Sequence, residues 1–334
     1  MEDSEKAYWE RHLKERFVIG EQLGRSGAST CAYRVYEKET GKSSVLLVPS
    51  EEILTDSDSS QMYMKKQRQA EEIKAFCISG YTGNVFIPTA EFGEVYRIMP
   101  YAGEDFTPQI YESLSKQDQE RLAFDLASYL NFVHQKSFDE KELLAQKSSS
   151  KIGKKAKDFY IKIELESYMK GKIPDTEYKK LQQLIDDFKQ RDTADEINVM
   201  THGDLRYQNI LYDKTTKKLA VIDYETAAIS NIYKDFCPSV ASSLPVQFIK
   251  DVIRFYNELP KKHPVSVDEK KISQMQAVFR VRELVYCGMI RGRNPLKTLY
   301  DIQREGILGP CVLTEQNFEA KRRQIINPRF RQYE

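Results

Sequence analysis

The chain has 334 residues, of which 51 are lysine or arginine and 50 are aspartate or glutamate, so its formal net charge is +1. This length allows one large or two modest domains with sizeable cores. Because the charges almost cancel, no overall electrostatic field would draw the protein to nucleic acid or to an anionic membrane, and we expect neither as a partner.

The cysteines and the N-terminal residues indicate the compartment. The five cysteines are odd in number, widely spaced and never arranged as C-x-x-C, which disfavours both a disulfide framework and a zinc site. Residues 1–6 are acidic and polar instead of basic and apolar, and no later apolar run approaches membrane-spanning length. The sequence therefore predicts a cytoplasmic protein without membrane insertion.

The N-terminal part is predicted to combine short strands with turns. A short amphipathic helix is expected at about residues 4–16, and a strand opens at Phe17. Between two strand-like runs, residues 23–35 are rich in Gly and Ser, so backbone N–H groups there could approach phosphate oxygens without obstruction by side chains. Taken alone, such a segment is more often a plain turn than a nucleotide-binding loop. Its candidate nucleotide contacts are Gly24, Ser26, Gly27 and Ser29.

Further strands and helices follow in chain order. The apolar run at 45–48 predicts a strand, and residues 61–78 predict a helix. Residues 95–104 predict an edge strand that continues into a connection punctuated by Pro and Gly. Residues 119–134 show helical spacing, and His134, at the end of this helix, is expected to be a buried structural histidine.

The most informative motif is H-G-D-L-R-Y-Q-N-I-L at residues 202–211, which is followed by V-I-D-Y-E at 221–225. Phosphoryl transfer requires an acceptor hydroxyl aimed at the terminal phosphate and a divalent metal that neutralises the phosphate oxygens. Asp204 would accept the hydroxyl proton, while Asn209 and Asp223 would ligate the metal. Carboxylate and amide oxygens suit Mg²⁺, which keeps waters and shares substrate phosphates.

Two short apolar runs separate the proposed metal ligands. Residues 210–212 and 219–222 have the character of strands, and the polar segment 213–218 between them has the character of a turn. A hairpin formed by these runs would bring Asn209 and Asp223 back to one point.

These segments resemble the catalytic loop and the metal loop of the aminoglycoside phosphotransferase and choline kinase superfamily. That family has H-G-D-L-x-x-x-N-I-L, then I-D-[WFY]-E, and a further Asp twelve positions after the metal Asp, where this chain has Asp235. The resemblance covers residues from about 17 to 300. It implies the two-lobed α+β fold of protein kinases, with a nucleotide-binding lobe at 1–98, a hinge at 99–106 and a catalytic and acceptor-binding lobe at 107–334.

The resemblance also implies roles for residues outside the two loops. The Gly/Ser-rich segment would cover the phosphates, and Asp235 and His202 would support the catalytic loop. Met99 and Tyr101 would lie near the adenine at the hinge, although ordinary core packing explains these two residues equally well. Either of the neighbouring acids Glu71 and Glu72 would pair with a phosphate-binding lysine, and a solvated helix face is an equal alternative for each.

One position departs from the family pattern. The family places a Lys on the third strand, where it holds the α- and β-phosphates, but this chain has Leu47 at that alignment. Because leucine cannot donate a hydrogen bond to phosphate, another cation must replace the lysine or nucleotide binding must differ. The candidates that could reach inward, among which the sequence does not choose, are Arg34, Lys42, Lys65 and Lys66.

The sequence favours a phosphotransferase that uses ATP and Mg²⁺ to phosphorylate a hydroxyl of a small molecule, of the choline, aminoglycoside or sugar kind. Arg206, two residues after Asp204, could direct its guanidinium to the γ-phosphate in the transition state. Two alternatives stay open: an atypical protein kinase with a protein substrate, and a pseudokinase binding module without the strand lysine. Against the pseudokinase, Asp204, Asn209 and Asp223 are all present.

Overall fold

The computed structural model describes residues 13–23, 30–50, 57–139, 197–236, 244–269 and 272. The chain divides into two compact units. The first unit comprises Met1–Phe76, Val85–Glu104 and Leu211–Glu225, and the second comprises Cys77–Asn84, Asp105–Ile210 and Thr226–Glu334. The first unit therefore includes residues 211–225. The sequence predicts these residues in the lobe at 107–334, because the predicted lobes are continuous in the sequence.

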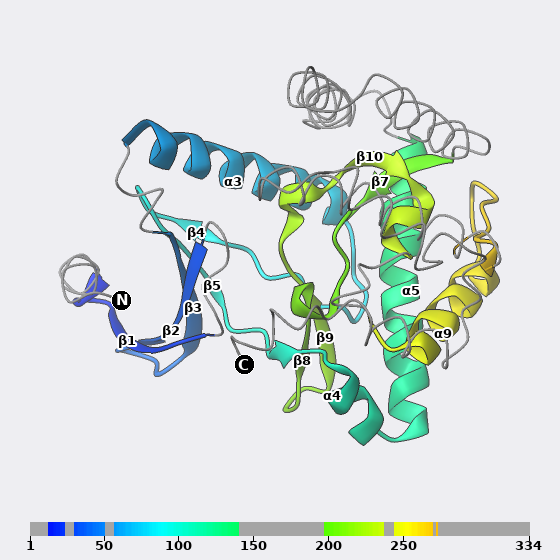
Figure 1. Ribbon diagram of the computed structural model, residues 1–334, viewed down its shortest axis with the longest axis horizontal. Coiled ribbons are helices and arrows are strands. Elements are labelled where there is room, and N and C mark those ends of the chain that lie inside the picture. The colour runs from blue at the N-terminus through cyan, green and yellow to red at the C-terminus, as the bar shows by residue number, and fades with distance from the viewer. Residues whose placement is uncertain are drawn as a thin grey trace, which may run out of the picture. The chain divides into compact units, whose positions relative to one another are not determined.

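A five-stranded antiparallel sheet forms the centre of the first unit (Figure 1). Its order is β1-β2-β3-β5-β4. The strands are β1 (Phe17–Gln22), β2 (Thr30–Glu37), β3 (Ser43–Pro49), β4 (Glu91–Phe92) and β5 (Arg97–Pro100). The turn between β2 and β3 contains Gly41 at a φ of 68°, a conformation that glycine adopts without steric cost. The strand predicted at 45–48 is thus confirmed as the middle of β3.

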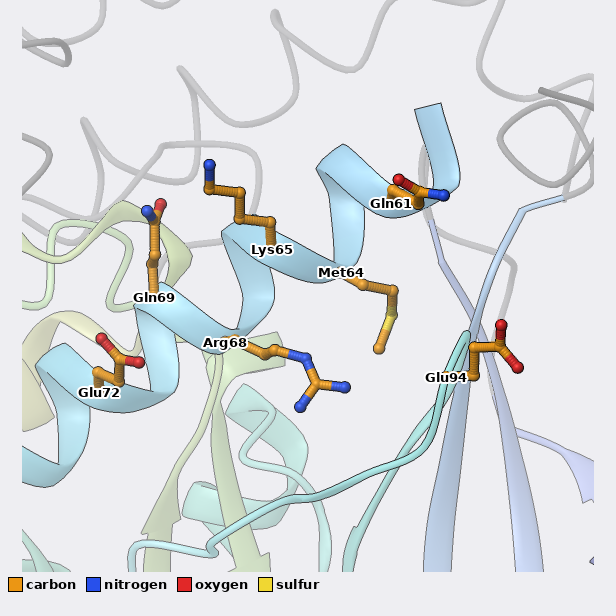
Figure 2. A pocket seen from close by; sticks show the side chains of 7 residues that line it. All are labelled: Gln61, Met64, Lys65, Arg68, Gln69, Glu72 and Glu94. Atoms are coloured by element: carbon orange, nitrogen blue, oxygen red, sulfur yellow. The ribbon is translucent and has the colours of Figure 1, made fainter. Parts of the chain in front are cut away.

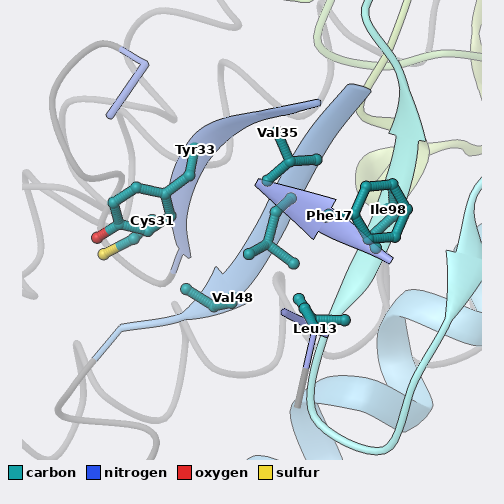
Figure 3. Packing of buried hydrophobic residues seen from close by; sticks show 8 residues of the cluster. Leu13, Phe17, Cys31, Tyr33, Val35, Val48 and Ile98 are labelled. Atoms are coloured by element: carbon teal, nitrogen blue, oxygen red, sulfur yellow. The ribbon is translucent and has the colours of Figure 1, made fainter. Parts of the chain in front are cut away.

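One face of this sheet carries the core of the first unit. Because successive side chains of a strand point to opposite faces, every second residue of β2 and β3 is buried against Leu13 and Phe17. Figure 3 shows this packing. The remaining members of the cluster are Cys31, Tyr33, Val35, Leu46, Val48 and Ile98. The alternate residues of the same strands, Leu47 among them, lie on the opposite face.

Helix α3 (Ser57–Ile78) belongs to the same unit and contains neither Gly nor Pro, so no residue interrupts its backbone ladder. The predicted helix at 61–78 is confirmed and begins four residues earlier. Met64 and Ile73 are buried. The ammonium group of Lys74, also buried, pairs with Glu71 and donates to the carbonyl of Pro88. Glu71 in turn accepts the N–H of Ala90 at 3.0 Å, so α3 is bonded to the segment before β4.

The predicted hairpin between the two loops is confirmed. Strands β8 (Ile210–Asp213) and β9 (Lys218–Val221) are hydrogen-bonded neighbours in a sheet of order β6-β8-β9, where β6 is Glu104–Asp105. The carboxylate of Asp213 accepts the N–H of Thr215 at 2.8 Å and the hydroxyl of Thr216 at 2.7 Å, which closes the turn.

Helices dominate the described part of the second unit. Helix α4 (Pro108–Ser113) begins after Thr107, whose hydroxyl accepts the N–H of Ile110. Helix α5 (Lys116–Asp139) extends the helix predicted at 119–134 in both directions and packs against α9 (Val246–Glu258), where the buried rings of His134 and Tyr256 meet. Strands β7 (Asn198–Thr201) and β10 (Ala228–Asn231) pair antiparallel beside them. These elements flank the 202–209 loop.

Some sequence expectations fall outside the described residues. They are the helix at 4–16 for all but its last residues, and the four candidate phosphate contacts Gly24, Ser26, Gly27 and Ser29. Within the part of the chain that the structure describes, no helix combines the length and apolar character needed to cross a membrane.

Candidate active site

The loop that follows β7 is held by a buried carboxylate. Asp235, at the end of a short 3₁₀ helix (Ile232–Asp235), accepts the N–H of His202 at 3.0 Å and the N–H of Gly203 at 2.8 Å. Because only 5% of Asp235 is exposed, water competes little for these charge-assisted bonds. Their effect is to fix the backbone immediately before Asp204.

The opposite side of Asp235 contacts two helices through a histidine. His134 of α5 places its Nε2 atom 3.2 Å from Asp235 Oδ2 and its Nδ1 atom 3.0 Å from the Tyr256 hydroxyl of α9. Burial alone would raise the pKa of Asp235, but the His134 hydrogen bond and charge, together with the Gly203 N–H, hold it below its ordinary value. The carboxylate is therefore ionised and ties the loop to the helical core.

Gly203 is required by the geometry of this loop. Its φ is 83°, and a Cβ atom at this position would lie 2.7 Å from the carbonyl oxygen of Thr226 and 2.8 Å from Nζ of Lys234. The hydroxyl of Thr226 also donates to the carbonyl of His202 at 3.0 Å. A larger residue would meet both a backbone conformation unfavourable to side chains and a close backbone contact.

Asp204 lies within a set of donors from its own loop. Asn209, which is buried, donates through Nδ2 to the carbonyl oxygen of Asp204 at 2.8 Å and to its Oδ2 atom at 2.9 Å. Arg206 Nε lies 3.2 Å from the same Oδ2 atom. Burial raises the pKa of Asp204 above its ordinary value, although the positive charge of Arg206 and the Asn209 hydrogen bond lower it. The predicted contact of Arg206 with the γ-phosphate stays a prediction.

Asp223, in the first unit, has a strained backbone. Its φ is 65°, and among the described residues only Lys217 of the hairpin turn shares a positive φ without being glycine. Residues in sparsely populated conformations persist where surrounding structure holds them, and they concentrate at functional sites. Two residues later, Glu225 accepts a hydrogen bond from Gln67 Nε2 at 3.1 Å and lies 3.5 Å from Lys66 Nζ, so α3 contacts this segment directly.

The candidate replacements for the strand lysine are distributed around the sheet. Arg34 pairs with Glu21 at 3.2 Å and places its guanidinium carbon 4.0 Å from the centroid of the Tyr101 ring. Lys42 is exposed in the turn before β3. Lys66 pairs with Glu225, as described above. Lys65 lines a surface pocket that is formed by residues of α3 together with Glu94 (Figure 2).

The two candidate acids on α3 have different surroundings. Glu71 pairs with Lys74 three residues along the same helix, and not with a strand residue. Glu72 is exposed and lines the pocket of Figure 2, so its supporting role stays a prediction. At the predicted hinge, Met99 is buried at the end of β5, and Tyr101 lies beneath the guanidinium of Arg34. Their proximity to adenine also stays a prediction.

Sequence reasoning missed Arg97, which lies directly opposite Leu47 in the register of β3 and β5. The sequence signal was its position two residues before Met99 in a predicted edge strand, but only the strand register reveals its neighbour. The pairing of His134 with Asp235 was missed in the same way, because 101 residues separate them.

The fold and these loops define a two-lobed, kinase-like class of α+β phosphotransferases. Residues 53–264 match the model of the Phosphotransferase enzyme family, and the chain belongs to this family. The predicted superfamily and the enzyme class, a kinase that phosphorylates a hydroxyl, are thereby confirmed.

Solved structures support the same fold. The chain is similar to an aminoglycoside phosphotransferase, APH(2")-IIa, solved in a ternary complex with streptomycin and ATP, with 17% identity, a TM-score of 0.62, and coverage of 91% of this chain and 96% of that one. A Plasmodium vivax ethanolamine kinase has 13% identity, a TM-score of 0.56, and coverage of 92% and 88%. At these identities the similarity establishes the fold, and the predicted two-lobed α+β architecture is confirmed.

Proposed function

We propose that the protein transfers the γ-phosphate of ATP to a hydroxyl of a small molecule, with Asp204 as the general base. The observation that carries the proposal is the double hydrogen bond from Asn209 to the main chain and carboxylate of Asp204. Together with the bonds from Asp235 to the preceding backbone, it restricts the base to one orientation. Such restriction is a large part of what phosphoryl transfer requires from a protein.

The environment of Asp204 suits proton transfer. A base works best when its pKa is not far below the operating pH, because it must be ionised at the start and still attract a proton in the transition state. Burial moves the pKa of Asp204 in this direction. As the acceptor oxygen forms its bond to phosphorus, its proton would pass to the free carboxylate oxygen of Asp204, and the bond from phosphorus to the leaving diphosphate would break.

The donor set fits Mg²⁺. Asn209 uses its amide nitrogen to hold Asp204, so its Oδ1 atom is the amide atom left for a metal, and Asp223 supplies a carboxylate. Both are hard oxygen ligands, which Mg²⁺ prefers. Mg²⁺ held by these residues would neutralise charge that develops on the phosphate oxygens.

The comparisons support the choice of nucleotide and acceptor class. APH(2")-IIa was solved with ATP and APH(2'')-Ib with ADP, which favours ATP as the phosphate donor here, with Met99 and Tyr101 beside the adenine and the residues 24–29 over the phosphates. The small molecules named for the similar structures, streptomycin and ethanolamine, both carry hydroxyl groups. We therefore place the acceptor among choline-like, aminoglycoside-like and sugar-like alcohols.

Leu47 favours a second candidate, a pseudokinase that binds partners without catalysis. Its apolar side chain takes the position at which the family pattern has a phosphate-binding lysine. A protein released from catalysis would have no chemical reason to hold Asp204 so closely, which is why we place this candidate second.

Calorimetric titration of Mg²⁺-ATP separates the two candidates. Wild type should bind the nucleotide, and Asp223→Ala should bind it more weakly because a metal ligand is lost. Asp213→Ala is the matched control, since it removes a carboxylate of the neighbouring hairpin turn, and it should bind as wild type does. Once binding is established, turnover with choline, ethanolamine, aminoglycosides and simple sugars would identify the acceptor class. A wild-type protein that binds no nucleotide would favour the pseudokinase.

A further inference from the structure

The face of the sheet that carries Leu47 has a cation beside it. In the register of the sheet, Leu47 pairs with Ala32 of β2 on one side and with Arg97 of β5 on the other. Directly paired residues of antiparallel strands point to the same face and have Cβ atoms about 5 Å apart. The side chain of Arg97 therefore begins one strand away from the position of the family lysine, on the same face of the sheet.

Helix α3 contacts this face of the sheet at the row of paired residues next to that of Leu47. The hydroxyl of Tyr63 lies 2.6 Å from the hydroxyl of Thr30, which pairs with Pro49 and so shares the face of Leu47. Burial raises the pKa of the Tyr63 phenol, the positive charge of Arg97 lowers it, and the carboxylates of Glu225 and Asp223 raise it. The phenol thus lies within electrostatic range of both Arg97 and the proposed metal ligand Asp223, all within the first unit.

Three other cations near the sheet are paired with protein groups. Arg34 pairs with Glu21 and stacks on Tyr101, and Lys66 pairs with Glu225. Lys74 is buried between Glu71 and the carbonyl of Pro88.

Arg97 differs from these cations. Its Nε atom is buried and has no hydrogen-bond partner in the structure. Arg34 Nε shares this property, but the guanidinium of Arg34 already has a carboxylate partner. A buried N–H without a partner is costly, and a phosphate oxygen would satisfy it.

We propose that Arg97 binds the α- and β-phosphates of the nucleotide in place of the missing strand lysine. This inference rests on the proposed function and names a binding residue for it. Arginine suits the task because its planar guanidinium can form two parallel hydrogen bonds to phosphate oxygens and stays charged at all working pH values. In this protein the phosphate-binding cation would come from β5 instead of β3, on the same face of the sheet.

Binding measurements with three ligands test the proposal. Mg²⁺-ATP, Mg²⁺-ADP and adenosine are titrated calorimetrically into wild type, Arg97→Leu and Arg97→Lys, with Lys38→Leu as an exposed control. Arg97→Leu should bind ATP and ADP about 10- to 100-fold more weakly, the range for hydrogen bonds to charged groups. Adenosine, which has no phosphate, should bind all four proteins equally. Arg97→Lys should retain part of the affinity.

A second-site variant tests the position of the cation directly. Leu47→Lys introduced into Arg97→Leu restores the family arrangement and should recover ATP affinity to within a few fold of wild type. Arg97→Leu alone could be too unstable to titrate. The double variant then still tests the proposal, because recovered ATP binding requires a folded protein.

The possible failures are distinguishable. If wild type binds neither ATP nor ADP, the proposed function fails and this inference with it. If wild type binds both and Arg97→Leu binds them equally well, only the inference is overturned. A parallel loss of adenosine and ATP affinity, or a folded double variant without recovered binding, would also overturn it, because either result separates Arg97 from the phosphates.

Discussion

The 202–209 loop and the side chains on the Leu47 face of the sheet are held in place in different ways. In the loop, the buried carboxylate of Asp235 accepts two backbone N–H groups and is itself paired with the buried His134, and Gly203 adopts a positive φ. The Leu47 face relies on single side chains whose places are set by strand register. A loop fixed through its backbone tolerates few substitutions, whereas a side chain placed only by strand register can be replaced by one from a paired strand, as we propose for the phosphate-binding cation.

The largest expected effect comes from Asp204→Asn, which removes the proposed base and keeps the size of the side chain. Turnover should fall by about 10²- to 10⁴-fold, the usual contribution of a general base, while Mg²⁺-ATP affinity stays near that of wild type. Steady-state kinetics and calorimetry on the same samples check both parts. The control is Asp213→Asn, a carboxylate of the turn between β8 and β9. Unchanged turnover in Asp204→Asn would show that Asp204 is not the general base.

The second prediction concerns the stability of the loop. Asp235→Ala leaves the N–H groups of His202 and Gly203, as well as His134, without their buried acceptor. The free energy of unfolding should fall by about 3–5 kcal/mol, because several buried donors lose their acceptor at once. Asp235→Asn should lose less, because the amide oxygen can still accept one of these bonds. Urea denaturation measures both variants, and a loss below about 1 kcal/mol for alanine would show that the loop is held elsewhere.

Alanine substitutions at two glycines of positive φ compare a crowded backbone position in the loop, Gly203, with an open one in the turn between β2 and β3, Gly41. Gly203→Ala combines a φ of 83° with a Cβ contact of 2.7 Å to a carbonyl oxygen, whereas Gly41→Ala has a φ of 68° and no atom within 4 Å. We expect about 2–4 kcal/mol of destabilisation at Gly203 and about 1 kcal/mol at Gly41, where only the conformational cost applies. Thermal unfolding of the two variants would show this difference. Equal losses would mean that the close contact relaxes freely.

The same contrast explains what the sequence could predict. Asp204 and Asn209 lie five residues apart in one loop, so a local motif was enough to single them out as candidates. The hairpin that follows consists of two apolar runs joined by a short polar turn, which is also a local pattern. Strands β1, β3, β8 and β9 and helices α3 and α5 were also found from sequence patterns, with errors at their ends. The run at 95–104 was wrongly predicted as an edge strand, because β5 lies between β3 and β4, and β4, β7 and β10 were not predicted. Arg97 was missed because its significance depends on its pairing with Leu47 in the sheet. The hydrogen bond between His134 and Asp235 was missed because it depends on packing between segments that are distant in the sequence. Neither relation leaves a local pattern in the sequence.

The smallest predicted effect, on the pH dependence of turnover, separates two roles for Arg206. Turnover requires ionised Asp204, so the rate should fall as the pH decreases through the pKa of that carboxyl. Because burial raises this pKa, the acidic limb should lie above the pH at which an ordinary aspartate titrates.

The charge of Arg206, 3.2 Å from Asp204, lowers the pKa of Asp204. Arg206→Ala should therefore raise this pKa and move the acidic limb to higher pH. If Arg206 acts only on the base, the rate at the alkaline plateau should stay at the wild-type value, and Arg206→Lys should restore the limb. A plateau lowered by tenfold or more would instead indicate that the guanidinium contacts the transferring phosphate. Turnover measured from acid to alkaline pH for wild type and the two variants distinguishes these outcomes, since a change in pKa moves the limb and a lost transition-state contact lowers the plateau.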